Sequence, residues 1–370
     1  MSADVAMRHH VRSPKGLVVR EVVLRDFRSY PRLELTLEAG VVLVTGPNGA
    51  GKTNLLEALH VGTQGFSPRA RNDAQMVRFG AEAARVRVRG ESGSTPFQAE
   101  LDLGVREPKR ARLNGAPLSS AEQLRLELRT LVFTPDRLGV VKGAPATRRA
   151  YLDRSLGRLF PARAALPAEY ASAVGQRNAA LRRLAAGIST REALDPWTEA
   201  VASLGRELVA ARKDTVSLLA PEFAAIAERL GLVDATISYD VTSPTAAELH
   251  ERLTRDLERG LTGAGPHLHD VELRAGNREL RHYASQGEQR VAVLSLVLAE
   301  ADAIGSRTGV PPLVLLDDVL SELDGDRRLA LAALIAADGG QTIVTATSRA
   351  AFPAEPAQAL VVSPGTVRQE

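Results

Sequence analysis

The sequence predicts an α/β protein in which a mainly helical segment interrupts a sheet domain. An apolar, β-branched run, VVLVT (41–45), is followed by a glycine-rich turn and then by leucines and alanines at helical spacing. A second run, PLVLLDD (312–318), has the composition of a strand buried on both faces. Between the two runs, apolar residues recur at helical spacing for most of a hundred residues.

Length and composition limit the number of domains and the classes of protein to consider. A chain of 370 residues can hold about two domains. It is 44% hydrophobic, and no apolar run approaches the ~18 residues of a membrane span, so we expect a cytoplasmic protein without a membrane partner. Zero cysteines exclude disulfides and thiolate metal sites, and the seven histidines lack HExxH-like spacing. The net charge is only +3, which permits nucleic acid as a partner without demanding it.

The expected organisation follows from the changes in pattern along the chain. Residues 1–16 lack the apolar core of a signal peptide and are expected to be a disordered tail, with Met7 as an alternative start. Alternating residues from Leu17 onward predict paired strands. We therefore predict a first part of the sheet domain at 17–134, an inserted helical domain at 135–262, and a second part of the sheet domain at 263–370.

The glycine-rich turn fits a phosphate-binding loop. Gly46, Gly51, Lys52 and Thr53 match G-x-x-x-x-G-K-[ST], the Walker A pattern or P-loop, whose backbone N–H groups wrap phosphates at a helix N-terminus. Lys52 would reach the β and γ phosphates, and Thr53 would bind Mg²⁺. A chance glycine turn is the alternative, but it would not need the buried strand before it or the amphipathic helix after it.

Two carboxylates end the second apolar run. Asp317 and Asp318 follow a predicted strand and should lie at its carboxyl edge, where parallel sheets bind ligands. Asp317 suits contact with Mg²⁺, and Asp318 suits polarisation of an attacking water. The alternative is a strand that ends in two solvated acids. Since 265 positions separate Lys52 from Asp317, a large segment must fit between neighbouring strands, and the helical insertion supplies it.

The stretch YASQGEQR (283–290) allows two interpretations. Ser285, with Glu288 three residues later, predicts a capping box at the start of a helix. The same serine, Gly287 and the N–H groups of a helix N-terminus also make an anion site. The chain would then carry two phosphate-binding surfaces.

This stretch also carries a family resemblance. Residues 285–289 look like the signature motif of ABC-type ATPases, and SELD (321–324) looks like their D-loop. Within that superfamily the chain is similar to the RecF family of the SMC-like branch. The resemblance is carried by LRDFRSY (24–30), GPNGAGKTNLLEALH (46–60), VKGAPATRRAYLD (141–153), QRNAALR (176–182), GPHLHDVEL (265–273), YASQGEQR and LLDDVLSELD (315–324).

The resemblance implies an ABC/SMC-head-like P-loop ATPase domain that uses ATP and Mg²⁺. The signature serine of one subunit closes on the γ-phosphate held by the other, so the family's ATPase is an ATP-dependent homodimer. The implied catalytic residues are Asp318 and Lys52, and the implied metal ligands are Thr53 and Asp317. The implied nucleotide-binding residues are Gly46, Asn48, Gly49, Gly51, Lys52, Thr53, Asn54, Ser285, Gln286, Gly287 and Glu288.

The family also implies a role in DNA recombination, repair, replication and the SOS response. Its members dimerise with ATP on DNA near single-strand/double-strand junctions, without sequence specificity, and assist RecO and RecR in loading RecA at gaps. Asp318 stands where transporters commonly have a glutamate, no convincing Q-loop glutamine is present, and Thr347 or Ser348 takes the place of the switch histidine. These departures imply slow turnover, and the resemblance implies stimulation by DNA, so we expect a weak, DNA-stimulated ATPase.

Clustered arginines are the only sign of nucleic acid outside the resemblance. RVRVRG (85–90) places three arginines on one face of a strand, and REPKRAR (106–112) adds four basic residues; a solvated basic face is the other interpretation. Arg148 and Arg149 could instead serve domain packing. Two rival functions remain: a transporter ATPase subunit with a membrane partner, and a metabolic P-loop kinase, for which YASQGEQR and SELD would be accidents. Neither rival should respond to DNA.

Overall fold

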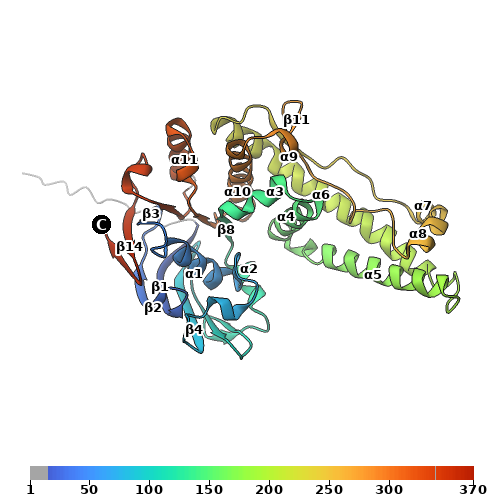
Figure 1. Ribbon diagram of the computed structural model, residues 1–370, viewed down its shortest axis with the longest axis horizontal. Coiled ribbons are helices and arrows are strands. Elements are labelled where there is room, and N and C mark those ends of the chain that lie inside the picture. Colours follow the sequence, from blue (N-terminus) through green and yellow to red (C-terminus); the bar gives the residue numbers. More distant parts are fainter. Residues whose placement is uncertain (1–15, 338) are drawn as a thin grey trace, which may run out of the picture. The chain divides into compact units, whose positions relative to one another are not determined.

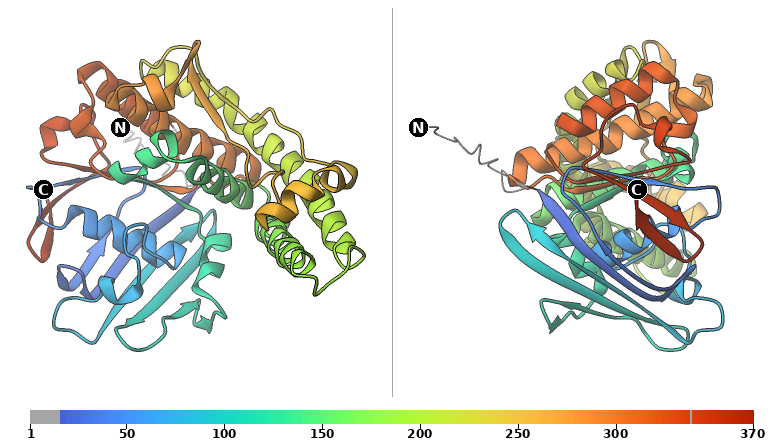
Figure 2. Two further views of the ribbon diagram at one scale, coloured as in Figure 1. Left: turned by 45° about the vertical axis from the view of Figure 1, so that its right-hand side comes forward. Right: turned by 90° about the vertical axis from the view of Figure 1, so that its left-hand side faces the viewer.

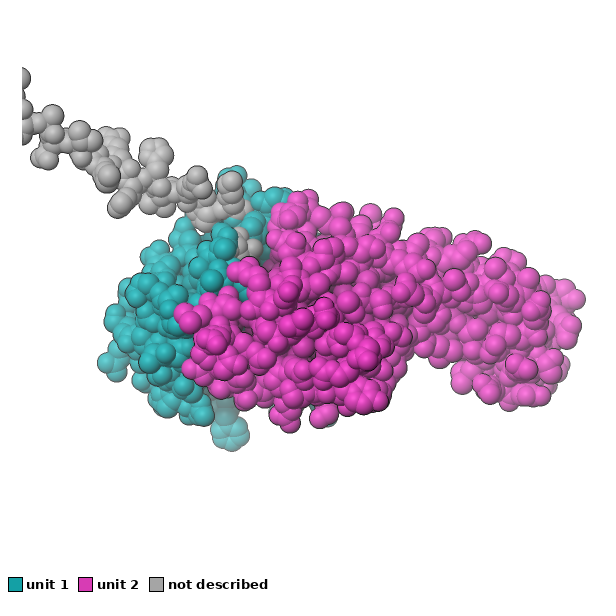
Figure 3. Space-filling view, turned by 90° about the horizontal axis from the view of Figure 1, so that it is seen from above, with its two compact units in different colours: residues 1–131, 308–316, 332–370 teal, residues 132–307, 317–331 magenta. Residues whose placement is uncertain are grey.

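The computed structural model describes residues 16–337 and 339–370, so the expected tail lies, except for Gly16, outside the described residues. The chain forms two compact units (Figure 3). Unit 1 comprises residues 1–131, 308–316 and 332–370, and unit 2 comprises residues 132–307 and 317–331. The two units are described separately below.

One sheet of unit 1 is antiparallel and has the strand order β2-β1-β4-β5-β6-β7 (Figure 1). Alternate residues such as Val86 and Val88 are buried on its inner face, where helix α1 (Lys52–Gln64) packs. A Cβ atom on Gly62 of α1 would lie 2.7 Å from the Val88 side chain, so the glycine permits this close packing. The strands are β1 Leu17–Phe27, β2 Tyr30–Thr36, β4 Ala83–Ser92, β5 Thr95–Gly104, β6 Arg110–Leu113 and β7 Ala116–Pro117.

The second sheet has the order β15-β14-β3-β13-β12-β8 and contains the predicted buried strands. Strands β14, β3, β13 and β12 run parallel, and every residue of β3, β12 and β13 is buried. Burial on both faces explains why these strands have continuous apolar runs in the sequence. Their bounds are β3 Val41–Thr45, β8 Thr130–Phe133, β12 Leu313–Leu316, β13 Thr342–Ala346, β14 Gln358–Ser363 and β15 Thr366–Gln369.

Unit 2 is mainly helical, as the insertion predicts. Helices α5 (Leu166–Ala185) and α6 (Asp195–Arg229) pack against each other as a long hairpin (Figure 2). The unit also contains a small sheet, β11-β10-β9, and helix α10. The remaining bounds are α2 Leu124–Glu127, α3 Gly139–Lys142, α4 Pro145–Leu159, α7 Ala246–Glu251, α8 Leu253–Arg259, α9 Leu280–Tyr283, α10 Gln286–Thr308, α11 Gly325–Ala337, β9 Ala235–Ser238, β10 Glu272–Ala275 and β11 Arg278–Glu279.

A buried ion pair ties the far end of the hairpin together. The side chain of Arg177 on α5 is 0% exposed and donates to Asp256 Oδ2 at 2.7 Å and to Thr262 Oγ1 at 3.0 Å. A guanidinium removed from water needs such partners, since an unpaired buried charge is strongly destabilising. The pair therefore fixes α5 to α8 and explains the arginine in QRNAALR.

The segment 265–270 crosses the helices of unit 2 as a strap. Arg148 on α4 makes a bidentate pair with Asp270, with N–O distances of 2.7 and 2.5 Å. Arg149 donates to the carbonyl oxygen of His269 at 2.6 Å, and Tyr170 and His267 are joined at 2.8 Å. Burial lowers the pKa of the His267 imidazole, so the ring is neutral in this contact. Both arginines thus serve packing within unit 2.

Candidate functional site

The predicted phosphate loop lies between β3 and α1 in unit 1, and its shape depends on glycine. Gly46, Gly49 and Gly51 have φ values of 148°, 81° and 116°, a region that other residues rarely adopt. At Gly46 a Cβ atom would lie 2.4 Å from the carbonyl oxygen of Val362. Only glycine therefore allows the chain to leave β3 and curl into a loop at this point.

The side chain of Lys52, which is expected to contact the nucleotide phosphates, lies along the phosphate loop. Its ammonium donates to the carbonyl oxygens of Gly46 at 2.7 Å and Pro47 at 3.0 Å, and the residue is only 8% exposed. Helix α1 starts at Gly51 without a side-chain cap and has no acidic residue in its first turn. An uncapped, acid-free N-terminus with a neighbouring ammonium is well suited to a polyanion.

The turn between β1 and β2 supports this loop, which the sequence did not predict. Tyr30 donates its hydroxyl to the carbonyl oxygen of Gly51 at 3.0 Å, and Asn54 donates to Ser29 Oγ at 3.0 Å. Burial raises the pKa of the Tyr30 phenol, so it remains a neutral donor. The stretch LRDFRSY contained the signal, but nothing in it indicates which residues would meet the loop.

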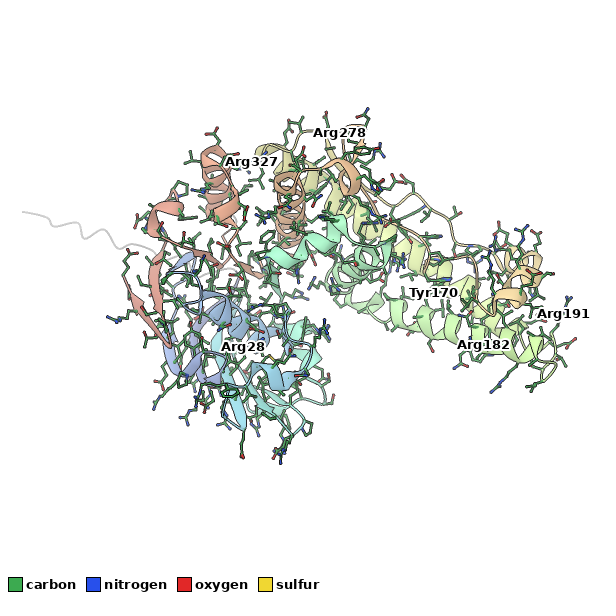
Figure 4. All side chains as sticks on the ribbon, in the orientation of Figure 1. Arg28, Tyr170, Arg182, Arg191, Arg278 and Arg327 are labelled. Carbon is green, nitrogen blue, oxygen red and sulfur yellow. The ribbon has the colours of Figure 1, made fainter. Side chains whose placement is uncertain are left out.

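A buried carboxylate holds the same turn. Arg28 (labelled in Figure 4) makes a bidentate pair with Glu57 of α1, with distances of 2.9 and 2.7 Å. Ser67 donates to the same carboxylate at 2.5 Å. Because Glu57 lies one turn beyond Lys52, this cluster fixes the turn to the helix that follows the loop.

The strand before the predicted acids ends at the carboxyl edge of the parallel sheet. Leu316 pairs in register with Val344 of β13, which in turn pairs with Leu43 of β3. Strand β12 therefore ends near the level at which β3 ends. Asp317 is buried, and its N–H donates to the carbonyl oxygen of Phe133 at 3.0 Å.

Asp318 has a backbone that few residues accept. Its φ of 50° lies in the left-handed region, where aspartate and asparagine are tolerated better than other non-glycine residues. Its carbonyl oxygen accepts a bond from Ser321 Oγ at 3.0 Å. Asp318 also lines a small cavity of about 110 Å³ together with Arg290 and Leu294 of α10.

The start of α10 forms the predicted capping box. Ser285 N–H donates to Glu288 Oε2 at 2.7 Å, and Glu288 N–H donates to Ser285 Oγ at 3.2 Å. The bond from the Ser285 amide lowers the pKa of the Glu288 carboxyl. Ser285 and Gln286 are nevertheless exposed, so the serine hydroxyl can still donate to a ligand.

Two arginines lie beside this capped start (Figure 4). Arg278 donates to Glu288 Oε1 at 3.2 Å. Arg327 of α11 lies close to Gly287, since a Cβ atom there would be 3.8 Å from Nη1 of Arg327. An ion pair between Arg290 and Glu322 also joins α10 to the segment SELD. The signature-like and D-loop-like stretches are thus neighbours within unit 2.

The predicted site residues divide between the units. Residues 46–54 belong to unit 1, whereas residues 285–288, 317 and 318 belong to unit 2. Within 16–337 and 339–370, no three histidine, aspartate or glutamate side chains form a metal-binding group. Thr53 and Asp317 each carry an oxygen donor, the type of ligand that Mg²⁺ prefers. Thr347 and Ser348 follow β13 and are exposed.

The arginines of β4 lie on one face of the strand, but acidic neighbours compensate them. Arg85 pairs with Asp102 at 2.6 Å, and Arg87 pairs with Glu100 at 2.9 Å. Two further pairs are Arg89 with Glu21 at 3.2 Å and Arg112 with Asp102 at 3.2 Å. The partners come from adjacent strands, so the basic run seen in the sequence is a charge-balanced sheet surface in the structure.

The layered sheets, the loop after β3 and the acids after β12 define a P-loop ATPase of the type found in SMC heads. The family model for the RecF/RecN/SMC N-terminal domain matches residues 18–363. The chain belongs to this family and, within it, to the RecF proteins. None of the helices in the part of the chain that the structure describes has the length and hydropathy needed to cross a membrane.

Sequence relatives agree over nearly the whole chain. The DNA replication and repair protein RecF of Heliobacterium modesticaldum is 36% identical, with 91% of this chain and 94% of the relative aligned. The protein of the same name from Frankia alni is 39% identical, with 90% and 94% aligned.

Solved structures are also similar to nearly the whole chain. The recombination mediator protein RecF–ATPrS of the RecFOR pathway has a TM-score of 0.82 at 26% identity, covering 97% of this chain and all of that one. The Smc head domain of Pyrococcus furiosus has a TM-score of 0.59 at 17% identity, covering 95% of each chain, and supports the fold alone.

Proposed function

We propose that the chain is a recombination mediator that uses ATP to dimerise on DNA. The observation that carries this proposal is the presence of two different helix N-termini on one chain: the glycine-shaped loop before α1 and the exposed Ser285 before α10. A related structure is described as RecF–ATP of the RecFOR pathway, which supports ATP as the nucleotide. Each nucleotide would lie between the phosphate loop of one subunit and Ser285 of the partner subunit.

We propose the following roles for the site residues. Lys52 already bonds two loop carbonyls and would exchange them for phosphate oxygens, while Gly46, Gly49 and Gly51 shape the loop. Asn48 and Asn54 would bind the nucleotide together with them. Thr53 and Asp317 would hold Mg²⁺, which neutralises phosphate charge when bound. Asp318 would orient the attacking water. Gln286, Gly287 and Glu288 would present Ser285 to the nucleotide of the other subunit.

The RecF relatives supply the biological setting of the proposal. We infer a cytoplasmic protein that binds double-stranded DNA and single-strand/double-strand junctions without sequence specificity. RecO and RecR would be its partners in loading RecA at gaps during recombinational repair, replication and the SOS response. Its ATPase would be weak and stimulated by DNA. We further propose that 17–134 and 263–370 form the ATPase domain around an insertion at 135–262.

A mixing experiment tests the composite site. Lys52→Ala and Ser285→Arg should each be inactive alone, the arginine through steric obstruction and charge at the start of α10. A heterodimer has one site with both defects and one with neither, so ATP hydrolysis should reappear when the two proteins are mixed. Ser285→Arg should still bind a fluorescent ATP analogue as a monomer, because its own phosphate loop is intact.

Controls separate the composite site from a simple helix cap. Ser285→Thr keeps the cap and the hydroxyl, and should retain ATP-dependent dimerisation in sedimentation. A Ser285→Arg protein that dimerises and hydrolyses ATP normally would overturn the proposal. Absence of any DNA stimulation in the wild-type protein would favour a transporter subunit or a metabolic kinase instead.

A further inference from the structure

Residues 78–81 of unit 1 form a tight turn that exposes one aromatic side chain completely. Ala81 N–H donates to the carbonyl oxygen of Arg78 at 3.0 Å, and Gly80 has a φ of 83° at the third position, as a type II turn requires. Phe79 at the second position is 100% exposed. The other seven phenylalanines of the chain are buried or half-buried, so Phe79 differs from every other residue of its type.

Hydrogen bonds and an ion pair hold the turn in place, so the exposure of the Phe79 side chain does not result from a loose loop. Arg78 N–H donates to the carbonyl oxygen of Asp26 at 2.7 Å, and its guanidinium pairs with the Asp26 carboxylate at 2.6 Å. Val77 forms a β-bridge with Phe27, and Arg28 N–H donates to the carbonyl oxygen of Met76 at 2.9 Å. A fixed aromatic ring loses little conformational freedom when a ligand stacks on it.

Basic side chains dominate the segment around this ring. Arg69 and Arg71 are exposed on the chain that leads to the turn, and Arg69 pairs with Glu57 at 3.5 Å. Asp73, the acid between them and the ring, pairs with Lys109 at 3.6 Å. Beyond the turn, a groove of about 830 Å³ begins at Ala81 and is lined by four arginines and three acids. Its charged lining residues are Arg25, Arg85, Arg106, Arg110, Glu82, Asp102 and Glu107.

We propose that Phe79 is a stacking platform for an unpaired base of DNA, with Arg71 contacting the adjoining phosphate. This inference rests on the proposed function and adds the side chain by which the protein would distinguish a single-strand/double-strand junction from a plain duplex. A base has an apolar face and an anionic backbone, which matches one aromatic ring among guanidinium groups. Stacking does not depend on base identity, in agreement with binding that is not sequence-specific.

A protein partner fits this surface less well. Protein interfaces have a core of several apolar side chains, whereas Val105 is the one large exposed apolar residue among those that line the groove. The balanced charges on β4 also leave that strand few arginines for DNA. The Phe79 turn with Arg71 is therefore the better candidate for the nucleic-acid contact of unit 1.

The test compares three DNAs with the full chain in the presence of ATP: a duplex, a single strand, and a junction with 2-aminopurine at the first unpaired position. We expect the wild-type protein to quench 2-aminopurine and to prefer the junction over the duplex. Phe79→Ala should lose the quenching and about tenfold in junction affinity, with duplex affinity unchanged. Phe79→Trp should restore both. Because the Phe79 side chain is fully exposed, neither change should disturb folding.

Two matched variants separate stacking from charge. Arg71→Ala should weaken binding to all three DNAs alike and reduce the slope of log affinity against log salt by about one. Ile188→Ala removes an apolar residue of unit 2 that is 77% exposed and should change nothing.

The outcomes distinguish this inference from the proposed function. A Phe79→Ala protein with wild-type junction preference and quenching would overturn the stacking role while leaving the mediator function intact. A Phe79→Ala protein that binds every DNA normally but no longer dimerises with ATP would show a protein contact instead, and would also overturn it. A wild-type protein that binds no DNA with ATP would overturn both proposals.

Discussion

Helices α1 and α10 both begin at a loop proposed to contact ATP, but their first turns are built in opposite ways. The N-terminus of α1 has Gly51 as its N-cap, no side-chain cap and no acid in its first turn. The N-terminus of α10 is closed by its own Ser285 and Glu288, which bond each other's amides. No capping side chain bonds the amides at the start of α1, whereas the capping box at the start of α10 uses two amides.

This difference assigns the two loops unequal tasks. The loop before α1 can bind a nucleotide by itself, because amides and the Lys52 ammonium converge on it. The start of α10 is closed by its own capping box, and the Glu288 carboxylate in that box pairs with Arg278 at 3.2 Å. It should contribute little affinity for free ATP and act on a nucleotide that another subunit already holds.

The largest effect should follow the loss of Lys52. Lys52→Ala removes a charge-assisted contact to phosphate, and such bonds contribute about 1.5–3 kcal/mol each, so ATP affinity should fall about 10²-fold or more. Titration with a fluorescent nucleotide measures the change, and circular dichroism checks the fold. Lys109→Ala, which removes another partly exposed lysine of unit 1, should bind ATP normally. Equal ATP affinity of the two variants would show that Lys52 does not bind the nucleotide.

Asp318 should affect turnover without affecting binding. Asp318→Asn removes the carboxylate that would orient water but keeps a residue that tolerates a φ of 50°, so hydrolysis should fall about 10²-fold with the backbone unstrained. Asp318→Ala should add about 1–2 kcal/mol of strain, visible in thermal unfolding. Asp326→Asn changes an exposed acid nearby and should hydrolyse ATP normally. Unchanged turnover in Asp318→Asn would point to a different base.

Glu288 tests the contrast between the two helices directly. Glu288→Gln keeps a capping-box residue but removes the negative charge, so the ATP-dependent dimer should become about fivefold tighter, as expected for a charge near a helix terminus. Sedimentation with ATP measures this, and Glu279→Gln is the control. A weaker dimer would mean that the carboxylate itself contacts the partner subunit.

Acid provides a second readout for Glu288. Its pKa is lowered in the folded chain by the bond from Ser285 N–H, so its contribution to stability is present at neutral pH and is lost as pH falls through the folded pKa. Thermal unfolding of Glu288→Gln should therefore depend less on pH in the acidic range than that of the wild-type protein.

The smallest effect is expected at Tyr30. Tyr30→Phe deletes one neutral hydrogen bond to Gly51, worth about 1 kcal/mol, so ATP affinity should fall about two- to fivefold. Tyr170→Phe removes a comparable buried hydroxyl from unit 2 and should leave ATP affinity unchanged. A Tyr30→Phe protein with full affinity would show that the glycines alone hold the loop.

The sequence predicted those features that depend on residues close together in the chain. The glycine loop, the strand before Asp317 and the Ser285–Glu288 capping box are local patterns, and the structure contains all three. The helical insertion was also predictable, because α6 keeps its apolar spacing through 35 residues despite Pro221.

Features that depend on distant residues were missed. Nothing in the sequence indicates that Tyr30 would meet Gly51, or that Glu57 would accept Arg28 and Ser67. The arginines of β4 were visible, but their neutralisation by Asp102 and Glu100 depends on the strand register. Sequence patterns thus located the loops, whereas the residues that support or neutralise them required the fold.

The strap at 265–270 has a mechanical consequence. Its ion pair to α4 and its contact with Tyr170 on α5 resist sliding, and the chain continues from Asp270 through β10, β11 and α9 to Ser285 within fifteen residues. A displacement of the helical hairpin would therefore be transmitted through these fifteen residues to Ser285, the residue that we propose contacts the nucleotide of the other subunit. Movement of the hairpin would then change the position of the signature-like stretch at 285–289.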